Sequence, residues 1–454
     1  MGTMGSADTR IAAAHPVSEG ENSMLSRRSF VSASIGTIAA VPALALLGCT
    51  APQGSGKAIS ADQTGHEQIT VDLMEMLEND PNLKKLVEKS LARAWEINPD
   101  PATNPAKDLG QLFEFTDWAA KCMPWDAIEG KPGSGIYERI DQSLDAFYFL
   151  FDQPLDELKD KGYYYPSLSY HQPIRGWLQN YALAWGSFLA SPDSWNDEYY
   201  ELICSDERFN MASGWYGDEN IWTSFNDWFS RKLVDQDASH PVDSDAAVVS
   251  PADSTPQGVW HIDQDGMFAL EEDGLALKSA RFNDIENLLG PDCAYKDSFN
   301  GGTFTHMFLD VNDYHRYHFP VSGTILEVEK IPAVDAIGGI TIWDPEEGKY
   351  VLLDQDPGWQ SIETRDRLII ETEDHGLVAI MPIGMSQVCS CNWEPTVQVG
   401  AHVEKGEPMG YFLFGGSDIC LMFQEGVEVE YLPAPNGDGT YAHILMGQAY
   451  CNLG

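Results

Sequence analysis

Apolar residues recur at helical spacing in the first half of the chain. Residues 66–80 (HEQITVDLMEMLEND) and 82–97 (NLKKLVEKSLARAWEI) place apolar side chains three and four positions apart, which is the pattern of an amphipathic helix. Segments 137–152 and 173–190 show the same spacing and are rich in aromatic residues, which we expect to pack in a core. The pattern predicts a helical N-terminal domain over residues 66–235.

After Leu233 the pattern changes to short apolar runs of strand length. Runs such as GTILEVEKI, DRLIIETED and GLVAIMPIG are bounded by Gly, Pro, Asp and Asn from about Ala247 to the end of the chain, as expected for β-strands separated by turns. The stretch GAHVEKGEPMGYFLF predicts a hairpin that turns near Lys405 and Gly406. Residues 236–454 are therefore predicted to form a β-rich domain, and the fold class is α+β.

The start of the chain has the features of a bacterial export signal. Residues 26–32 (SRRSFVS) show the twin-arginine pattern, and the apolar stretch 35–47 is too short to span a bilayer comfortably. Cys49 follows LLG, the position of the lipid-modified first residue of a lipoprotein; a buried apolar helix is the alternative interpretation. We expect residues 1–48 to be a signal and 49–65 a tether, which predicts an exported, extracytoplasmic, membrane-anchored lipoprotein.

The charge of the chain excludes one class of partner. It has 27 Lys and Arg against 70 Asp and Glu, a formal net charge of −43. Such a surface repels nucleic-acid phosphates and anionic lipid headgroups, so we expect no nucleic-acid partner.

Residues that can carry chemistry lie in three short segments. DVNDYHRYHFPVSG contains His315 and His318, and VVSPADS contains Asp253. YFLFGGSDICLMF interrupts an apolar run with two glycines and Ser417. Each feature has a structural alternative, namely hydrogen-bonded histidines, a turn-forming aspartate and a bulge at the glycines. A serine, a histidine and an aspartate can also act as nucleophile, base and orienting group, so a serine hydrolase is one interpretation.

A metal site is a weaker interpretation of the histidines. It needs a third ligand, for which His306 and Asp310 are candidates, but their spacing matches no zinc pattern. The seven cysteines other than Cys49 match no such pattern either, and an odd number cannot all pair. We therefore predict no metal.

Five segments together resemble, in order, the phosphatidylserine decarboxylase family. The resemblance covers about residues 225–425, and the aromatic-rich N-terminal part is similar to an extension found in a branch that includes fungal tryptophan decarboxylases. The segments are FNDWFSRKL, VVSPADS, LKSARFNDIENLLG, FNGGTFTHMFLDVNDYHRYHFPVSGTI and KGEPMGYFLFGGSDICLMF.

The resemblance implies an enzyme that cleaves its own chain and makes a pyruvoyl cofactor from a serine. Cleavage would fall between Gly416 and Ser417 and release a 38-residue chain, 417–454. Ser417 would attack the Gly416 carbonyl, and His318 would act as base with Asp253 orienting its ring. His315 would protonate the carbanion left by CO₂, and the pyruvoyl group would accept the electrons released. Neither pyridoxal phosphate nor a metal is required.

Two positions depart from the family pattern. Ser254 stands where the family usually has Gly, and Asp418 stands where it usually has Thr. We expect the Asp418 carboxylate to lie beside the reacting serine, where it would raise the pKa of neighbouring groups or supply another base.

The resemblance favours phosphatidylserine as substrate, with phosphatidylethanolamine and CO₂ as products. A lipid anchor would hold the site near a bilayer, whereas the net charge of −43 opposes docking on anionic lipid. A free amino acid, for example an aromatic one such as tryptophan, is the alternative substrate. A serine hydrolase or a non-catalytic lipoprotein would instead keep an intact chain.

Overall fold

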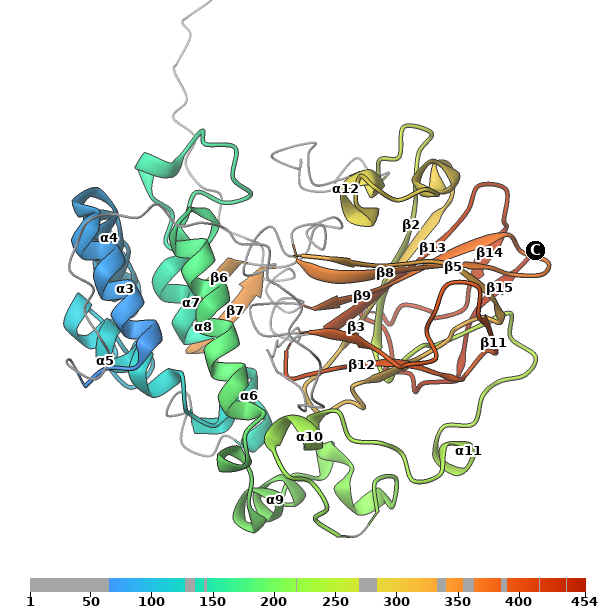
Figure 1. Cartoon of the computed structure of the whole chain (residues 1–454), viewed down its shortest axis with the longest axis horizontal. Helices are drawn as coiled ribbons and strands as arrows, with labels where there is room; N and C mark the ends of the chain where they lie inside the picture. Colours follow the sequence, from blue (N-terminus) through green and yellow to red (C-terminus); the bar gives the residue numbers. More distant parts are fainter. Residues whose placement is uncertain are drawn as a thin grey trace, which may run out of the picture.

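The helices of the N-terminal half form one layer of the protein (Figure 1). In this computed structural model the described residues are 65–126, 135–142, 145–217, 219–268, 284–332, 340–353, 363–384, 390–415, 417–437 and 439–454. The segment predicted to be an export signal, Cys49 and Gly416 lie outside them. The α-helices are α3 (Gln68–Asn79), α4 (Pro81–Ile97), α5 (Leu109–Ala119), α6 (Ile136–Asp141), α7 (Asp145–Phe151), α8 (Ile174–Leu189), α9 (Asp197–Cys204), α10 (Phe225–Phe229), α11 (Gln236–Ser239) and α12 (Ile285–Leu289).

These helices agree with the predicted periodicity. Asp80 separates α3 from α4 because its side chain accepts hydrogen bonds from the backbone N–H groups of Asn82 (2.9 Å) and Leu83 (3.0 Å), which caps α4. The buried faces share an aromatic core, in which Phe147 and Tyr181 stack with ring centroids 4.2 Å apart. No helix in the described part of the chain is long and apolar enough to cross a membrane.

A seven-stranded antiparallel sheet forms the centre of the C-terminal half (Figure 1). Its strand order is β11-β5-β8-β9-β13-β3-β2, so β13 is an inner strand with a partner on each side. From Ile419 to Phe423 both faces of β13 are buried in core clusters, which explains why these residues are apolar without alternation. The strands are β2 (Thr255–His261), β3 (Thr303–Leu309), β5 (Gly323–Ile331), β8 (Thr364–Glu371), β9 (Leu377–Gly384), β11 (His402–Val403) and β13 (Ser417–Phe423).

Smaller sheets flank the central one. A three-stranded sheet has the order β10-β12-β4, and another has the order β1-β15-β14. The β6–β7 hairpin comes from the β-rich half of the sequence but packs against α7, where Tyr350 lies 5.1 Å from Phe149 between ring centroids. The strands are β1 (Val248–Val249), β4 (Arg316–His318), β6 (Ile340–Asp344), β7 (Lys349–Leu353), β10 (Cys391–Trp393), β12 (Pro408–Phe412), β14 (Val429–Tyr431) and β15 (Ala449–Leu453).

The hairpin predicted at Lys405 and Gly406 is wrong. A turn is present, in which the Glu407 N–H donates to the Glu404 carbonyl (3.1 Å) and Gly406 has a φ of +87°. The strands on either side join different sheets, since β11 pairs with β5 and β12 pairs with β10 and β4. A turn signal therefore predicted the reversal, but the partners were chosen by tertiary packing.

Candidate active site

Ser417 is the first residue of the inner strand β13. It pairs with Gly384 of β9 on one side and with Leu309 of β3 on the other. Its side chain is completely buried, and its hydroxyl donates to the Gly415 carbonyl at 3.2 Å. The sheet therefore holds the predicted cofactor serine on a rigid element, directly after the glycine pair.

The chain leading to Ser417 is held by the helical layer. Phe414 is fully buried and meets three aromatic rings edge-on, those of Trp185 (5.6 Å), Phe225 (5.1 Å) and Phe229 (5.3 Å) between centroids. Edge-to-face packing of this kind restricts both position and orientation of a ring. The N-terminal end of β13 therefore faces the helical domain.

His315 reaches this segment through β12. Its carbonyl accepts from the Phe412 N–H (2.9 Å), and its ring stacks on Phe229, which in turn contacts Phe414. His315 Nδ1 lies 3.0 Å from the Asp313 carbonyl, and because a carbonyl can only accept, Nδ1 carries the hydrogen. The lone pair is then on Nε2, which is buried and has no hydrogen-bond partner among the residues that the structure describes.

Burial keeps the His315 ring neutral. Its pKa lies well below the usual value because burial disfavours the charged form and the Arg231 guanidinium repels it. The neutral ring has its lone pair at Nε2, so His315 has to take up a proton there before it can protonate a carbanion.

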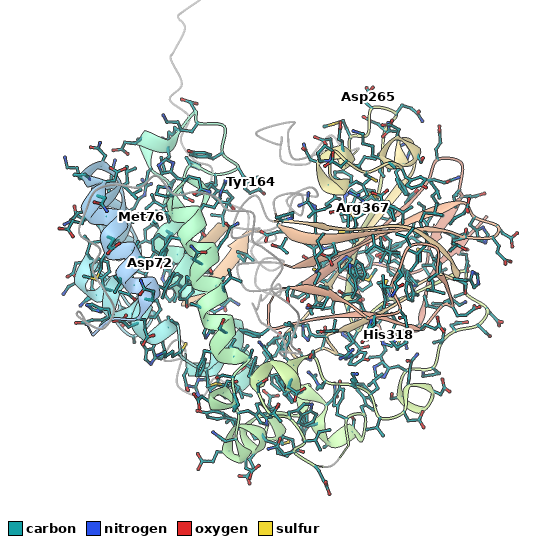
Figure 2. The ribbon with its side chains drawn as sticks, in the orientation of Figure 1. Asp72, Met76, Tyr164, Asp265, His318 and Arg367 are labelled. Atoms are coloured by element: carbon teal, nitrogen blue, oxygen red, sulfur yellow. The ribbon has the colours of Figure 1, made fainter. Side chains whose placement is uncertain are left out.

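Burial also keeps the His318 ring neutral, but both of its ring nitrogens already have a hydrogen-bond partner. Its Nδ1 lies 2.9 Å from the Gly406 carbonyl, and its Nε2 lies 3.1 Å from the Tyr314 hydroxyl. Burial lowers the pKa of His318 to about 4. Figure 2 shows His318 in the β-rich half of the molecule, where it faces Pro408 at the start of β12.

Asp253 does not hydrogen-bond to His318. Its carboxylate accepts from the Met446 N–H (2.8 Å) and lies 3.1 Å from His240 Nε2. The link to His318 runs through Tyr314, whose ring lies between those of His240 (5.7 Å) and His318 (5.8 Å). His240 is a lone histidine outside the motif segments, so no pattern in the sequence indicated it.

Asp418 points away from Ser417. Neighbouring residues of a strand face opposite sides of the sheet, and the Asp418 carboxylate instead lies 2.8 Å from Nε2 of His306 on β3. Burial raises the pKa of Asp418, and the His306 ring opposes that rise. The expectation that this carboxylate lies beside the serine hydroxyl is therefore wrong, because strand alternation separates them.

The candidate metal ligands have other partners. His306 pairs with Asp418, and Asp310 accepts a hydrogen bond from the Tyr137 hydroxyl (2.5 Å). Within the described ranges, no group of three or more His, Cys, Asp or Glu side chains is arranged to hold a metal ion.

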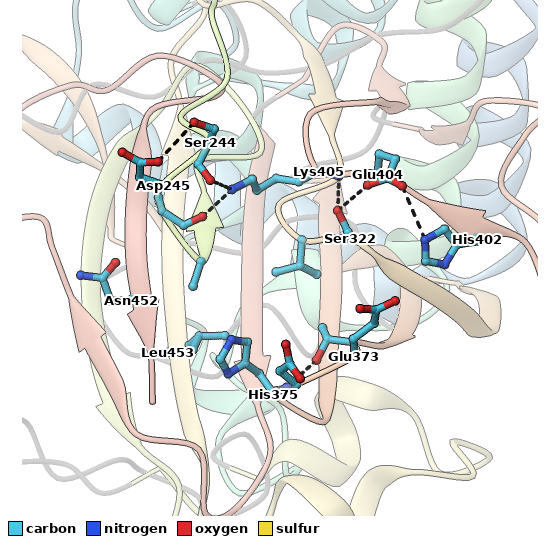
Figure 3. A pocket seen from close by; sticks show the side chains of 15 residues that line it. Ser244, Asp245, Ser322, Glu373, His375, His402, Glu404, Lys405, Asn452 and Leu453 are labelled. Atoms are coloured by element: carbon cyan, nitrogen blue, oxygen red, sulfur yellow. Dashed lines mark hydrogen bonds and ion pairs between the residues drawn. The ribbon is translucent and has the colours of Figure 1, made fainter.

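Two pockets differ in their relation to these residues. One, of about 760 Å³, is lined by polar side chains including Ser322, His375 and Lys405 and contains none of the predicted site residues (Figure 3). The other, of about 380 Å³, is lined by Tyr314 and His318 together with charged side chains of both signs. The second pocket therefore opens on the histidine segment.

The fold and the site define a protein with an inner-strand serine that follows a glycine pair, and with two buried, neutral histidines in the segment that leads into and forms β4. The sequence model of phosphatidylserine decarboxylase matches residues 225–452, about half of the chain, and the chain belongs to this family. The match begins at α10 and extends past the region of resemblance to the last strand.

Curated relatives of two kinds are similar to this chain. L-tryptophan decarboxylase of Psilocybe cyanescens is 29% identical over 296 residues, covering 57% of this chain and 64% of the relative. The enzyme of the same name from Psilocybe cubensis is 27% identical over 300 residues, with the same coverage. Phosphatidylserine decarboxylase proenzyme of Fusobacterium nucleatum is 31% identical over 205 residues, covering 45% of this chain and 61% of the relative. The matches thus span somewhat less than two thirds of these relatives.

Proposed function

We propose that the protein is a decarboxylase that makes a pyruvoyl cofactor from its own Ser417. The observation that supports this most is the complete burial of Ser417 in an inner strand directly after the glycines. A hydrolase nucleophile has to meet a substrate from outside, whereas a serine that attacks its own backbone does not. Burial therefore favours self-processing over the serine-hydrolase alternative.

Self-processing uses the atoms of this chain alone, with water. Ser417 Oγ attacks the Gly416 carbonyl carbon, the peptide C–N bond breaks, and an ester forms while the nitrogen of residue 417 becomes a free amine. A base then removes the α-proton of residue 417, and the ester C–O bond breaks to leave a Gly416 carboxylate. Water replaces the amine, which leaves as ammonia, and residue 417 becomes pyruvoyl.

The two histidines supply the proton transfers in this proposal. His318 is the base for processing, and its Tyr314 partner connects it to the Asp253–His240 pair. His315 acts in decarboxylation, because its ring stacks on Phe229 of the aromatic cluster that holds Phe414 and its buried Nε2 has no hydrogen-bond partner within the described part of the chain. A pyruvoyl group at position 417 would supply the electron sink for loss of CO₂.

We propose a free amino acid as the substrate, with an aromatic side chain as the first candidate. The aromatic helical layer holds the end of β13 that would carry the cofactor, and the Psilocybe relatives are named for tryptophan. The net charge of −43 opposes approach to an anionic bilayer.

Phosphatidylserine is the second candidate. The family and the Fusobacterium relative are named for it, and the proposed lipid anchor at Cys49 would place the protein at a membrane. The two substrates call for different assays.

Intact mass spectrometry of the purified protein tests processing. We expect two chains, with the smaller beginning at residue 417 and blocked to N-terminal sequencing by the pyruvoyl group. Ser417→Ala and His318→Ala should remain single chains, and His315→Ala should be cleaved yet release little CO₂. An unbroken wild-type chain ending at Gly454 contradicts the proposal, and labelling by a serine-directed phosphonate would then favour a hydrolase. An uncleaved His315→Ala chain overturns the division of roles between the histidines.

Release of CO₂ identifies the substrate. Phosphatidylserine vesicles are compared with single amino acids, starting with L-tryptophan, and Ser417→Ala serves as the inactive control. Activity on vesicles but on no free amino acid would reverse our order of the two candidates.

A further inference from the structure

The end of the chain packs onto the Asp253 segment. Ser254 and Ile444 exchange two backbone hydrogen bonds of 2.9 Å each, and the Gly447 N–H donates to the Ser250 carbonyl (3.0 Å). The Met446 N–H adds a bond to the Asp253 carboxylate (2.8 Å). Residues 443–448, which we call the C-terminal strap, would belong to the short chain after cleavage between residues 416 and 417.

The first residue of the C-terminal strap contacts the histidine segment. His443 Nε2 lies 2.8 Å from an Asp313 carboxylate oxygen. Asp313 is almost completely buried (4% of its side chain exposed), whereas His443 is partly open to solvent (41%). A buried carboxylate needs a partner for its charge, and His443 supplies it from a segment 130 residues further along the chain.

Asp313 in turn determines the shape of the turn that presents His315. Its second carboxylate oxygen accepts from the Asp310 N–H (2.7 Å), which closes the turn. Its carbonyl accepts from Nδ1 of His315 (3.0 Å) and from the Arg231 guanidinium (3.0 Å). The Asp313 carbonyl therefore fixes which nitrogen of His315 carries the lone pair.

The charges around His443 favour its protonated form. Burial opposes that form, but the carboxylate of Asp313, and those of Asp253 and Asp310 further off, raise the pKa of His443 to about 9. His443 is then a cation at neutral pH, bonded to an otherwise buried anion.

We infer that His443 is a positioning residue for decarboxylation: through Asp313, the C-terminal strap holds the turn that orients His315 toward the cofactor position. The short chain would then contribute two parts to the site, the cofactor at residue 417 and the group that holds the proton-transferring histidine in place. This inference rests on the proposed function, because it assigns His443 a role in the same reaction.

His443→Gln tests the inference, because glutamine keeps a hydrogen-bond donor but carries no charge. The matched control is His402→Gln, since His402 is half-exposed and its ion-pair partner is the surface residue Glu404. Cleavage is followed by intact mass, and kcat and KM for CO₂ release are measured from pH 6 to 10. The probe is L-tryptophan or phosphatidylserine vesicles, whichever the wild type decarboxylates. Saturating substrate keeps ionisation of the free substrate out of kcat.

We expect His443→Gln to be cleaved. Its KM should lie within about 2-fold of wild type, and its kcat at pH 7.5 should be reduced about 10-fold. The reason is that a small misplacement of a reacting group lowers the reaction rate more than it weakens substrate binding. The wild-type kcat should fall as pH rises through about 9, where His443 loses its proton, and His443→Gln should lack this fall. His402→Gln should match the wild type in all respects.

Two results overturn the inference. One is a wild-type kcat for His443→Gln, and the other is a reduced kcat that still falls near pH 9, which would indicate a structural role alone. A wild-type protein that is neither cleaved nor active contradicts the proposed function instead, so the two failures are distinguishable.

Discussion

Removal of the Phe414 ring should slow self-cleavage much more than its effect on stability explains. The ring is fully buried between three aromatic rings of the helical domain, two residues before the scissile carbonyl. Phe414→Ala should cost about 3–5 kcal/mol of unfolding free energy, the usual range for a buried phenylalanine. A displacement of the scissile peptide by about 1 Å should reduce the cleavage rate about 100-fold.

Phe304→Ala is the control that separates an effect on the position of the scissile peptide from an effect on the stability of the protein. Phe304 is equally buried and contacts the rings of Phe268 (4.7 Å) and Trp260 (5.6 Å), but it faces Met422 on β13, far from the cleavage site. It should lose a similar amount of stability yet be cleaved at a near-normal rate.

Both substitutions are measured in two assays. Urea unfolding is compared in the uncleavable Ser417→Ala background, so that every protein is a single chain. Cleavage is followed by intact mass over time after cell-free synthesis. Equal cleavage rates for Phe414→Ala and Phe304→Ala would refute the view that the helical domain positions the scissile peptide.

Three further predictions concern charges. Since burial lowers the pKa of His318 to about 4, the cleavage rate should be constant from pH 6 to 8 and fall only toward pH 4; a midpoint near the ordinary histidine pKa would contradict the base assignment. Asp418→Asn should still be cleaved, at a rate within about 3-fold of wild type, because the side chain faces away from the serine. It should lose about 1–3 kcal/mol of unfolding free energy, because its bond to His306 is weakened. Failure to cleave would show that Asp418 acts at the serine. Burial raises the pKa of Asp152 to about 7, so the contribution of this carboxyl to the free energy of unfolding falls as pH rises from about 4 through 7. In urea unfolding, Asp152→Asn should therefore gain stability relative to wild type between pH 5 and 8. A difference that stays constant with pH would refute the shift.

Local pattern was enough to predict the elements and the candidate residues. Helical spacing predicted α3, α4 and α8, and the short bounded runs predicted strands such as β8 and β9. The motif segments predicted the family, which the match over residues 225–452 confirms. Spacing within a segment depends on neighbours in the chain, so the sequence carries this information directly.

The partners of those residues came only from the tertiary structure. No pattern near Asp253 indicates that His240 and Met446 would bind it, or that Asp418 would pair with His306. The hairpin predicted at Lys405 failed for the same reason, because its two strands found partners in different sheets.

The sequence alone therefore determined the α+β class, the family and the serine–histidine–aspartate set, since each depends on residue types at short spacing. The tertiary structure decided which nitrogen of His315 carries the lone pair, which face Asp418 occupies, and that His443 reaches Asp313 from the end of the chain. These are contacts between segments up to 130 residues apart, and such contacts are selected by the packing of the whole sheet and not by any local stretch.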